Sequence, residues 1–338
     1  MSYVYDVSII LVNYNGKKYL EALFESLKRL RHDDFTFEVV FEDNASTDDS
    51  VAFLYEKGYD KDLNLNVVRS DVNRGFAGGN NFGIENSKGR YVVCLNNDTA
   101  VDILWLQELY HMILQNPEYG MVNSKLVFFY DFIKLKFQTQ DKIFHKKQIE
   151  INGTSYQLDN KFCKNLLYNK EDITCFGHTE ISVPLLFGTN TREIKIDIKQ
   201  FNEKTDFIMI ADKTYPIKNS NIILNLTSDQ IKRYQYTLIQ NAGSGVTENY
   251  DGFDIGFCEL DGEMYQKPYE INNGCGASIM MSREDFDNCG GYDERFFMYY
   301  EDTDLSYRIR KLGKKIMFCP SSVVRHIHTG SSTECNVI

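Results

Sequence analysis

Residues 7–16 read VSIILVNYNG, an amphipathic stretch KKYLEALFESLKRL follows at 17–30, and a second apolar run, FEVVFE, occupies 37–42. This order predicts strand, helix and strand, and the two strands are expected to be parallel because parallel neighbours need a crossover connection. In the predicted helix, apolar side chains recur at the three- and four-residue spacing of one buried face. They are Tyr19, Leu20, Leu23, Phe24, Leu27 and Leu30.

The same pattern repeats along the chain. A helix is predicted over 49–57, capped by Asp48 or Thr47, and LNVVRS at 65–70 predicts a strand. A glycine-rich turn then leads into a helix near 80–88, before the strand RYVVCL at 90–95. The sequence therefore predicts an α/β fold, with a mostly parallel sheet and flanking helices.

The segment from 131 to 240 differs from both of its flanks. Its later part contains short alternating or apolar runs, typical of antiparallel strands. They are ISVPLLF, REIKIDI, DFIMIAD and NIILNLT. We expect a β-rich insertion at 131–240 between two parts of one α/β domain, 1–130 and 241–338. In the second part, GASIMMS predicts a strand, EDTDLSYRIRKLG a helix that ends near Gly313, and KKIMFCP a last strand.

Composition narrows the class of protein. The 338 residues are 43% hydrophobic and 25% charged, which excludes disorder, and the net charge of −11 argues against binding nucleic acid. The eight cysteines form no CxxC pair, so we expect reduced thiols rather than a zinc cluster or disulfides. No apolar run approaches the roughly 18 residues of a membrane span, and Asp6 stands where a signal peptide would be basic. These features predict a cytosolic protein.

Polar clusters follow three predicted strands, at the edge of a parallel sheet where ligands bind. Asn13 and Tyr14 offer an amide and a ring that can read and stack on a base, although Asn-Gly is also a common turn. Asp43 can accept from a ring imide or a ribose hydroxyl, while Asp48 in the same run can cap a helix. Asp98, in the run NNDT, is placed to hold a divalent cation, with turn formation as the competing interpretation.

Three later segments also carry candidate chemistry. NRGFAGGNN at 73–81 resembles a phosphate cradle but fits neither GxGxxG nor GxxxxGK[ST], which disfavours dinucleotide-binding and kinase-like classes. YYEDTDL at 299–305 places three carboxylates at a helix start, where the helix dipole favours them and where one could act as a general base. His326 and His328 share one face of a predicted strand, where one could complete a metal site.

Seven segments occur in one order along the chain: VSIILVNYNG, FEDNASTDDS, NRGFAGGNNFGI, GRYVVCLNNDT, NNGCGASIMMSREDF, GGYDERFFMYYEDTDLSYRIRKLG and VVRHIHTGSS. Together they resemble an inverting glycosyltransferase of family 2, with the GT-A fold, and are most similar to its rhamnosyltransferase-like bacterial members. Segment 131–238 lies outside the resemblance and is longer than the family leads us to expect.

The resemblance implies roles for residues at matching positions. It assigns the general base to Asp302, with Glu301 and Asp304 in support. It implies a divalent metal, Mn²⁺ or Mg²⁺, held by Asp98 and His326, with His328 in reserve. The residues it implies for the nucleotide-sugar site are Asn13, Tyr14, Asp43, Asn44, Gly75, Asn80, Asn96, Asn97 and Gly276. Asn96 stands where the family has a first carboxylate, so this metal site would carry less charge.

The implied reaction is the transfer of a sugar from a nucleoside-diphosphate donor to a hydroxyl of a glycan or lipid-linked acceptor, with inversion, in surface polysaccharide synthesis. Deoxythymidine-diphosphate rhamnose is the donor that the resemblance suggests, and the cytoplasmic face of a bacterial membrane is the location. Two alternatives remain. One is a sugar-nucleotide pyrophosphorylase, which would need a basic, glycine-rich loop near the N-terminus; VNYNGKKYL has lysines but only one glycine. The other is a non-catalytic protein that binds a glycan or nucleotide sugar on a degenerate scaffold.

The insertion is open to three interpretations: a carbohydrate-binding β-domain, a dimerisation element or a peripheral membrane contact. Its lysine-rich start, FIKLKFQTQDKIFHKK at 132–147, suits attraction to anionic lipid. Solvated lysines on β-strands and loops account for the same pattern.

Overall fold

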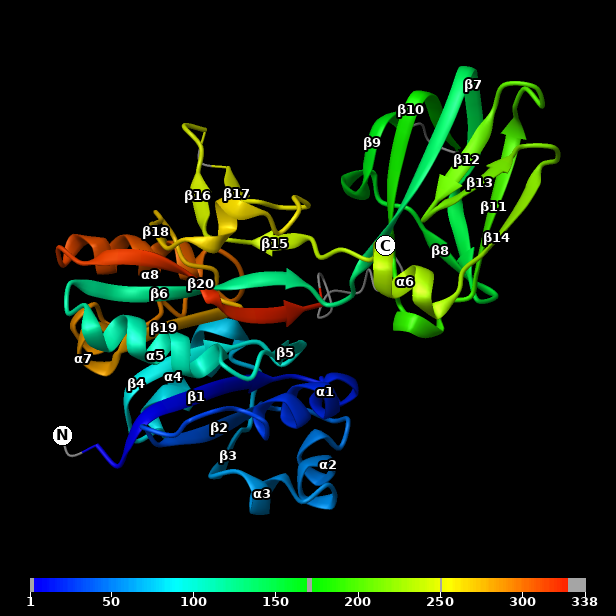
Figure 1. The fold of residues 1–338 in the computed structure, drawn as a ribbon. Coiled ribbons are helices and arrows are strands. Elements are labelled where there is room, and N and C mark those ends of the chain that lie inside the picture. Colours follow the sequence, from blue (N-terminus) through cyan, green and yellow to red (C-terminus); the bar gives the residue numbers. More distant parts are fainter. Residues whose placement is uncertain (1–2, 169–171, 250, 328–338) are drawn as a thin grey trace. The chain divides into compact units, whose positions relative to one another are not determined.

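The computed structural model describes residues 3–168, 172–249 and 251–327. His328 and the residues after it lie outside this described part. The chain divides into two compact units, which are described separately (Figure 1). The core unit comprises 3–129 and 239–327, and the inserted unit comprises 130–238.

The core unit is built on a curled, mixed sheet with the strand order β18-β20-β6-β19-β4-β1-β2-β3, while β15 pairs with β6 and β5 pairs with β20. Its strands are β1 (Tyr5–Asn13), β2 (Phe37–Asn44), β3 (Leu65–Ser70), β4 (Gly89–Leu95), β5 (Thr99–Val101), β6 (Tyr119–Phe128), β15 (Ile239–Asn241), β18 (Tyr269–Glu270), β19 (Ser278–Ser282) and β20 (Lys315–His326). The first four strands along the chain, β1 to β4, run parallel to one another, as predicted. Strand β19 is antiparallel to both of its neighbours, β4 and β6.

Helices cover both faces of this sheet. The helices of the core unit are α1 (Lys17–Leu27), α2 (Ser50–Glu56), α3 (Tyr59–Asp62), α4 (Gly75–Glu85), α5 (Trp105–Gln115), α7 (Arg283–Asn288) and α8 (Glu301–Lys311), with a 3₁₀ turn η3 (Glu263–Gln266). Apolar side chains of α1, α2 and α5 pack on one face, and those of α4, α7 and α8 pack on the other. No helix in the described residues is long and apolar enough to cross a bilayer.

Local turn chemistry moves one predicted boundary. Helix α4 begins at Gly75, five residues before the expected start near 80. Asn73 Oδ1 accepts from Gly75 N over 2.9 Å, and Gly75 has φ +69°, so the turn is completed earlier and the glycine-rich run becomes helical. Helix α2 begins at Ser50 and its N-cap is Asp49, not the predicted Asp48 or Thr47, and the Asp49 side chain makes no capping hydrogen bond. Asp48 Oδ1 accepts from Ser50 N over 3.2 Å from the position before the cap.

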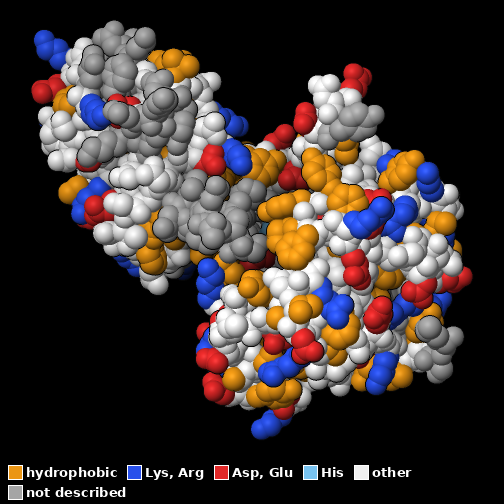
Figure 2. Space-filling model, turned by 180° about the vertical axis from the view of Figure 1, so that it is seen from behind, with side chains coloured by type: hydrophobic (Ala, Val, Ile, Leu, Met, Phe, Trp, Pro, Cys, Tyr) orange, Lys and Arg blue, Asp and Glu red, His pale blue; other side chains and the backbone are white. Residues whose placement is uncertain are grey.

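A short hairpin, β16 (Ser244–Val246) and β17 (Gly252–Asp254), belongs to the core unit and forms a separate two-stranded sheet. In Figure 1 it stands out from the main sheet of its unit. The space-filling view shows acidic and basic side chains interspersed over the visible face, with groups of hydrophobic side chains among them (Figure 2). The negative net charge is therefore not gathered into one patch on this face.

The inserted unit is β-rich, as predicted. Its eight strands all pair antiparallel around one apolar core that includes Phe137, Ile181 and Ile208. The strands are β7 (Phe132–Ile151), β8 (Thr154–Gln157), β9 (Cys163–Tyr168), β10 (Asp172–Pro184), β11 (Glu193–Gln200), β12 (Phe207–Ile210), β13 (Lys213–Pro216) and β14 (Asn221–Asn225). A helix, α6 (Ser228–Tyr234), and the 3₁₀ turns η1 (Asn160–Phe162) and η2 (Gly188–Asn190) complete it. Much of the lysine-rich 132–147 segment forms β7, and its side chains at 140–147 lie outside the description.

Candidate active site

The carboxyl ends of β1, β2 and β4 meet at one edge of the core sheet. Asn13 and Asp43 are direct partners in the parallel β1–β2 pairing. The Asn13 amide is fully buried: Nδ2 donates to Ser46 Oγ over 3.0 Å, and Oδ1 accepts from Asn97 Nδ2 over 2.8 Å. Asn13 thus fastens the three strand-end loops to one another, and a Cβ at Gly16 would lie 2.2 Å from Asn97 Nδ2.

Asp43 and Tyr14 are two candidate ligand-binding residues at this edge, one buried and one exposed. Asp43 is buried, its Oδ1 has no hydrogen-bond partner, and its Oδ2 lies 3.9 Å from Arg69 Nε. Tyr14 is 53% exposed. An unsatisfied carboxylate oxygen beside an exposed ring leaves both groups available to a flat, hydrogen-bonding ligand such as a base.

Asn44 is engaged within the protein. Its Oδ1 accepts from Arg74 N over 2.8 Å, and its Nδ2 donates to Asn73 Oδ1 and Gly75 O over 3.1 and 3.0 Å. With both ends of the amide used, Asn44 holds the turn that starts α4.

The start of α4 fits closely against the loop that precedes α8. Phe76 N donates to Phe297 O over 2.8 Å, and a Cβ at Gly75 would lie 2.2 Å from the same oxygen. Asn80 is buried one turn later, and its Nδ2 donates to Phe76 O over 2.9 Å. The glycine at position 75 therefore allows a close approach of two backbones in the structure.

Asp98 and His326 come together where β5 begins and β20 ends. Asp98 Oδ1 lies 3.1 Å from His326 Nε2, but it is buried and makes no hydrogen bond of acceptable geometry. Asn96 Nδ2 lies 3.3 Å from the same Nε2. An orphaned buried carboxylate oxygen beside an imidazole nitrogen is a donor pair that fits a divalent cation.

Gln240 sets the tautomer of the neutral His326 ring. His326 Nδ1 lies 2.7 Å from Gln240 Oε1, which can only accept, so the ring hydrogen is on Nδ1. Nε2 then carries the lone pair that a metal needs, and the outer hydrogen bond fixes the orientation of the ring. Within residues 3–168, 172–249 and 251–327, no three His, Cys, Asp or Glu side chains gather as a metal cluster, so a cation here would take its remaining ligands from elsewhere, such as phosphate oxygens and water.

Asp302 sits in the first turn of α8, with both carboxylate oxygens held. Gly276 N donates to Oδ2 over 2.9 Å, and Thr303 N donates to Oδ1 over 2.7 Å. Burial raises the pKa of Asp302, against these hydrogen bonds, which lower it. A raised pKa brings a carboxylate closer to the range useful for taking a proton.

The other two acidic residues of the segment have different surroundings. Glu301 is buried, its Oε2 has no hydrogen-bond partner, and burial together with the Asp302 charge raises its pKa to about 7. Asp304 Oδ2 instead pairs with Arg308 Nη2 over 2.5 Å, and Arg308 Nη1 donates to Cys289 O and Gly291 O over 2.6 and 2.5 Å. Asp304 is therefore part of an ion pair that braces a neighbouring loop.

The loop before β19 connects these groups. Asn96 N donates to Ala277 O over 3.0 Å, so the loop that carries Asp98 is bonded to the residue next to Gly276. One main-chain hydrogen bond, from Asn96 N to Ala277 O, and one from Gly276 N to the Asp302 carboxylate therefore link the Asp98 loop to Asp302 through two adjacent residues.

Several supporting residues were missed in the sequence analysis. Gln240 holds His326, and Asn123 Oδ1 accepts from Cys275 N over 2.7 Å. Asn81 Oδ1 accepts from Tyr292 N over 2.9 Å, which ties α4 to the loop before α8. Only Asn81 lay in a segment that the sequence had singled out, the glycine-rich run.

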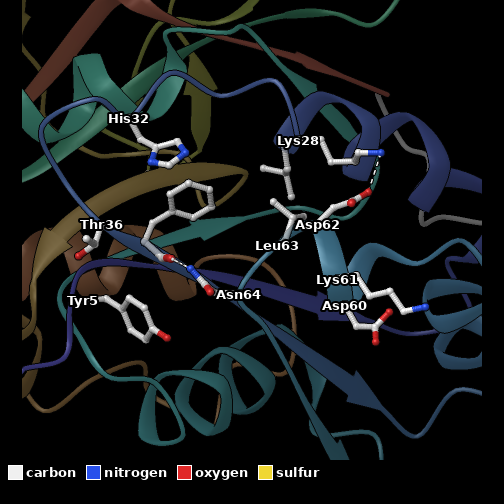
Figure 3. A pocket seen from close by; sticks show the side chains of 11 residues that line it. Tyr5, Lys28, His32, Thr36, Asp60, Lys61, Asp62, Leu63 and Asn64 are labelled. Atoms are coloured by element: carbon white, nitrogen blue, oxygen red, sulfur yellow. Dashed lines mark hydrogen bonds and ion pairs between the residues drawn. The ribbon is translucent and has the colours of Figure 1, made fainter.

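A separate hollow of about 350 Å³ lies at the other edge of the core sheet, near the amino ends of β1 and β2 (Figure 3). Tyr5, His32 and Asn64 line it, and Lys28 forms an ion pair with Asp62 over 2.8 Å. Asn64 Nδ2 donates to Phe37 O over 3.1 Å. None of the predicted site residues contributes to this pocket.

Fold and site together define an α/β protein of the GT-A type, with amide, carboxylate and imidazole groups gathered at the carboxyl edge of its sheet. The chain belongs to glycosyl transferase family 2, whose family model matches residues 8–177. Residues 258–330 match a second model, the N-terminal domain of galactosyltransferase.

Known relatives cover parts of the chain. The N-acetylglucosaminyl-diphospho-decaprenol L-rhamnosyltransferase of Mycobacterium tuberculosis is 43% identical over 58 residues, 17% of this chain and 19% of that protein. The poly-beta-1,6-N-acetyl-D-glucosamine synthase of Staphylococcus epidermidis is 28% identical over 118 residues, 35% of this chain and 28% of that protein. The chain thus matches less than a third of the length of either relative.

A solved structure supports the fold over most of the chain. The crystal structure of GalNAc-T7 with UDP, GalNAc and Mn²⁺ aligns with a TM-score of 0.55 and 15% identity, covering 96% of this chain and 44% of that one. At this identity the likeness concerns the fold alone.

Proposed function

We propose that the chain transfers a sugar from a nucleoside-diphosphate donor to a hydroxyl of a glycan or lipid-linked acceptor, with inversion at the anomeric carbon. The observation that carries the proposal is the link from the Asp98–His326 pair to Asp302, through the hydrogen bonds Asn96 N–Ala277 O and Gly276 N–Asp302 Oδ2. A group that suits a cation and a fixed carboxylate base are the two needs of such a displacement.

The donor would lie along the carboxyl edge of the sheet. Asp43 Oδ1, buried and unsatisfied, would accept from the base or the ribose, and the Tyr14 ring would stack on the base. Asn13, Asn97 and Asn44 would shape this pocket through the loops that they hold together. Gly276 would place its backbone beside the sugar.

Asp98 Oδ1 and His326 Nε2 would hold a divalent cation, Mn²⁺ or Mg²⁺. When bound, the cation supplies positive charge that neutralises the diphosphate leaving group. Asn96 adds an amide but no charge at this position. Asp98 and His326 would provide the carboxylate and imidazole ligands, and the remaining ligands would come from outside the protein.

Asp302 would remove the proton of the acceptor hydroxyl as that hydroxyl attacks the anomeric carbon. Its two oxygens are held by Gly276 N and Thr303 N, so the carboxylate keeps its orientation before the acceptor arrives. One in-line attack on the face opposite the leaving group inverts the anomeric centre. The pKa of Glu301 is raised to about 7, so its carboxyl group would exchange a proton near neutral pH and support Asp302 as the base.

Surface polysaccharide synthesis in a bacterium is the setting that the relatives favour, since both act, by name, on N-acetylglucosamine-containing glycans or glycolipids. A lipid-linked acceptor would bring the protein to the cytoplasmic face of the membrane. Rhamnose, as a deoxythymidine diphosphate, is one donor to test, and UDP-N-acetylglucosamine is another.

The test is release of nucleoside diphosphate from UDP-N-acetylglucosamine, UDP-galactose, GDP-mannose and dTDP-rhamnose, with and without Mn²⁺, with simple glycosides as acceptors. We expect metal-dependent turnover of one donor, lost in Asp302→Asn and kept in Asp60→Asn, an exposed carboxylate at the opposite sheet edge. If the wild type released no nucleotide from any of the four donors, the proposal would be wrong, and a non-catalytic role would take its place.

A further inference from the structure

The β16–β17 hairpin carries a carboxylate that none of the sequence motifs includes. Ser244 and Asp254 are direct partners in this antiparallel pair. Asp254 Oδ1 accepts from Asn241 Nδ2 over 2.7 Å and from Ser244 Oγ over 3.0 Å. Asn241 is buried, so the carboxylate is held from a fixed point in the core unit.

The second oxygen of this carboxylate is open. Asp254 is exposed, and among the described residues Oδ2 accepts no hydrogen bond. A carboxylate with one oxygen anchored and the other free is oriented in advance to receive a donor from outside the protein.

The hairpin lies near both segments that hold Asp302: its base is bonded to the Gly276 loop, and its far end, at Gly252, approaches the residue before α8. Ser244 N donates to Asn273 O over 2.9 Å, and Asn273 N donates to Ser244 O over 3.0 Å, three residues before Gly276. On the other strand, a Cβ at Gly252 would lie 4.0 Å from the ring and hydroxyl of Tyr300, the residue that precedes α8. The hairpin therefore contacts the Gly276 loop and the start of α8 at once.

The charge of Asp254 is felt at Asp302. It is one of the causes that raise the pKa of Asp302, after burial, and it also raises the pKa of Cys275. Glu301, Cys275 and Tyr292 are the other titratable groups that interact with Asp302. Glu301 is buried, so of the two carboxylates that act on Asp302, Asp254 is the exposed one.

We propose that Asp254 binds the acceptor: its free oxygen accepts a hydrogen bond from one hydroxyl of the acceptor sugar and so presents a neighbouring hydroxyl to Asp302. Tyr300, 50% exposed, lies near Gly252. Gly252 is two residues before Asp254 in β17 and therefore shares its face of the hairpin, so the Tyr300 ring offers an apolar surface to a sugar on that face. Asp254 thereby helps to select which hydroxyl is glycosylated. This inference rests on the proposed transferase function.

The test compares Asp254→Asn with Asp251→Asn, an exposed carboxylate on the same hairpin that is not among the causes of the Asp302 shift. An asparagine at 254 keeps an oxygen for Asn241 and Ser244, so the fold of the hairpin is preserved. Transfer is measured to p-nitrophenyl glycosides of N-acetylglucosamine, galactose and rhamnose, and hydrolysis of the same donor by water is measured without a glycoside.

We expect Asp254→Asn to raise KM for the glycoside by about ten-fold or more, while donor hydrolysis at pH 8 stays within about two-fold. Because a negative charge is removed, the pKa of Asp302 falls, so the acid limb of the rate profile moves to lower pH. The same limb, read on donor hydrolysis, reports how the Asp254 charge acts on Asp302, whereas KM for the glycoside reports acceptor binding. Asp251→Asn should match the wild type in each measurement.

Three results would overturn the inference, and they are distinguishable. An equal KM in Asp254→Asn, with an active wild type, would refute the acceptor role whether or not the acid limb moves, and would leave the transferase intact. A wild type that releases no nucleotide would refute the proposed function and this inference with it. If Asp254→Asn failed to fold, Ser244→Ala, which keeps the charge but loses one hydrogen bond to Oδ1, should raise KM by a few-fold, and an unchanged KM would count against the role.

Discussion

The backbone amide of Gly276 donates a hydrogen bond to Asp302 Oδ2 over 2.9 Å, so a carboxylate at the start of α8 is held by the loop that precedes β19. The two residues are 26 positions apart in the sequence, and their contact fixes the proposed base before any substrate binds. Thr303 N, which donates to Oδ1 over 2.7 Å, completes this hold.

Asp302→Asn removes the group that would take the acceptor proton. We expect kcat to fall by about 10²- to 10⁴-fold, the usual contribution of a positioned general base, with nucleotide binding unchanged. An asparagine keeps an oxygen for Gly276 N, so the loop should remain in place. Steady-state kinetics and calorimetry on the same preparation check both parts, and a variant with wild-type kcat would assign the base elsewhere.

Glu42 makes stability depend on pH. Burial raises its pKa from 4.5 to about 8, with the Asp43 charge adding to the rise and with Ser70 and Arg74 opposing it. The folded state then binds the proton more tightly than the unfolded state, so stabilisation is lost as pH rises from about 4.5 through about 8.

Glu42→Gln should therefore melt at a higher temperature than the wild type at pH 8 and differ little at pH 5. Thermal melts at the two pH values check this expectation. A variant that gains nothing at pH 8 would show that the Glu42 carboxylate is ionised at little expense in the folded protein.

Gly75→Ala tests the close approach of α4 and the loop before α8. A Cβ there would lie 2.2 Å from Phe297 O, and φ is +69°, so we expect a loss in the free energy of unfolding of about 1 kcal/mol or more. Gly58→Ala is the matched control, because Gly58 has φ +76° but no atom within 4 Å of an added Cβ. Denaturant unfolding should show the larger loss at Gly75, and equal losses would mean that backbone conformation alone is responsible.

Gln240→Leu removes the acceptor that holds His326 Nδ1–H. We expect Mn²⁺ affinity in the presence of UDP to fall by about 10- to 100-fold, as for other residues that orient a metal ligand. Gln240→Glu keeps an acceptor and should stay closer to the wild type. Electron paramagnetic resonance of free Mn²⁺ measures both, and an unchanged affinity in the leucine variant would remove Gln240 from the account.

The periodicity of apolar residues was enough to predict the parallel strands and the helix that contains Leu20 and Leu23, because burial on a sheet or helix face imposes a fixed spacing. It did not predict the start of α4, where Asn73 and Gly75 form a turn that makes the glycine-rich run helical. Local hydrogen bonding decided that boundary.

The site was predictable only where its residues follow strands directly. Asp98 directly precedes β5, and the antiparallel pairing of β5 with β20 sets Thr99 opposite His326, so the two side chains meet through a short strand that the sequence analysis did not predict. Gln240 and Asp254 lie in segments without periodicity, and they reach the site through long-range pairing of β15 and of the hairpin base. No local signal marks such residues in the sequence.

Calorimetric titration of UDP, dTDP and GDP, with and without Mn²⁺, tests the central claim most directly, on the wild type and on Asp98→Ala. The account predicts that one nucleotide binds in a metal-dependent way and that the binding is lost in Asp98→Ala, because the orphaned Asp98 oxygen and His326 Nε2 hold the cation that the diphosphate needs. Failure of all three nucleotides to bind with the metal present, or equal binding by the variant, would contradict it.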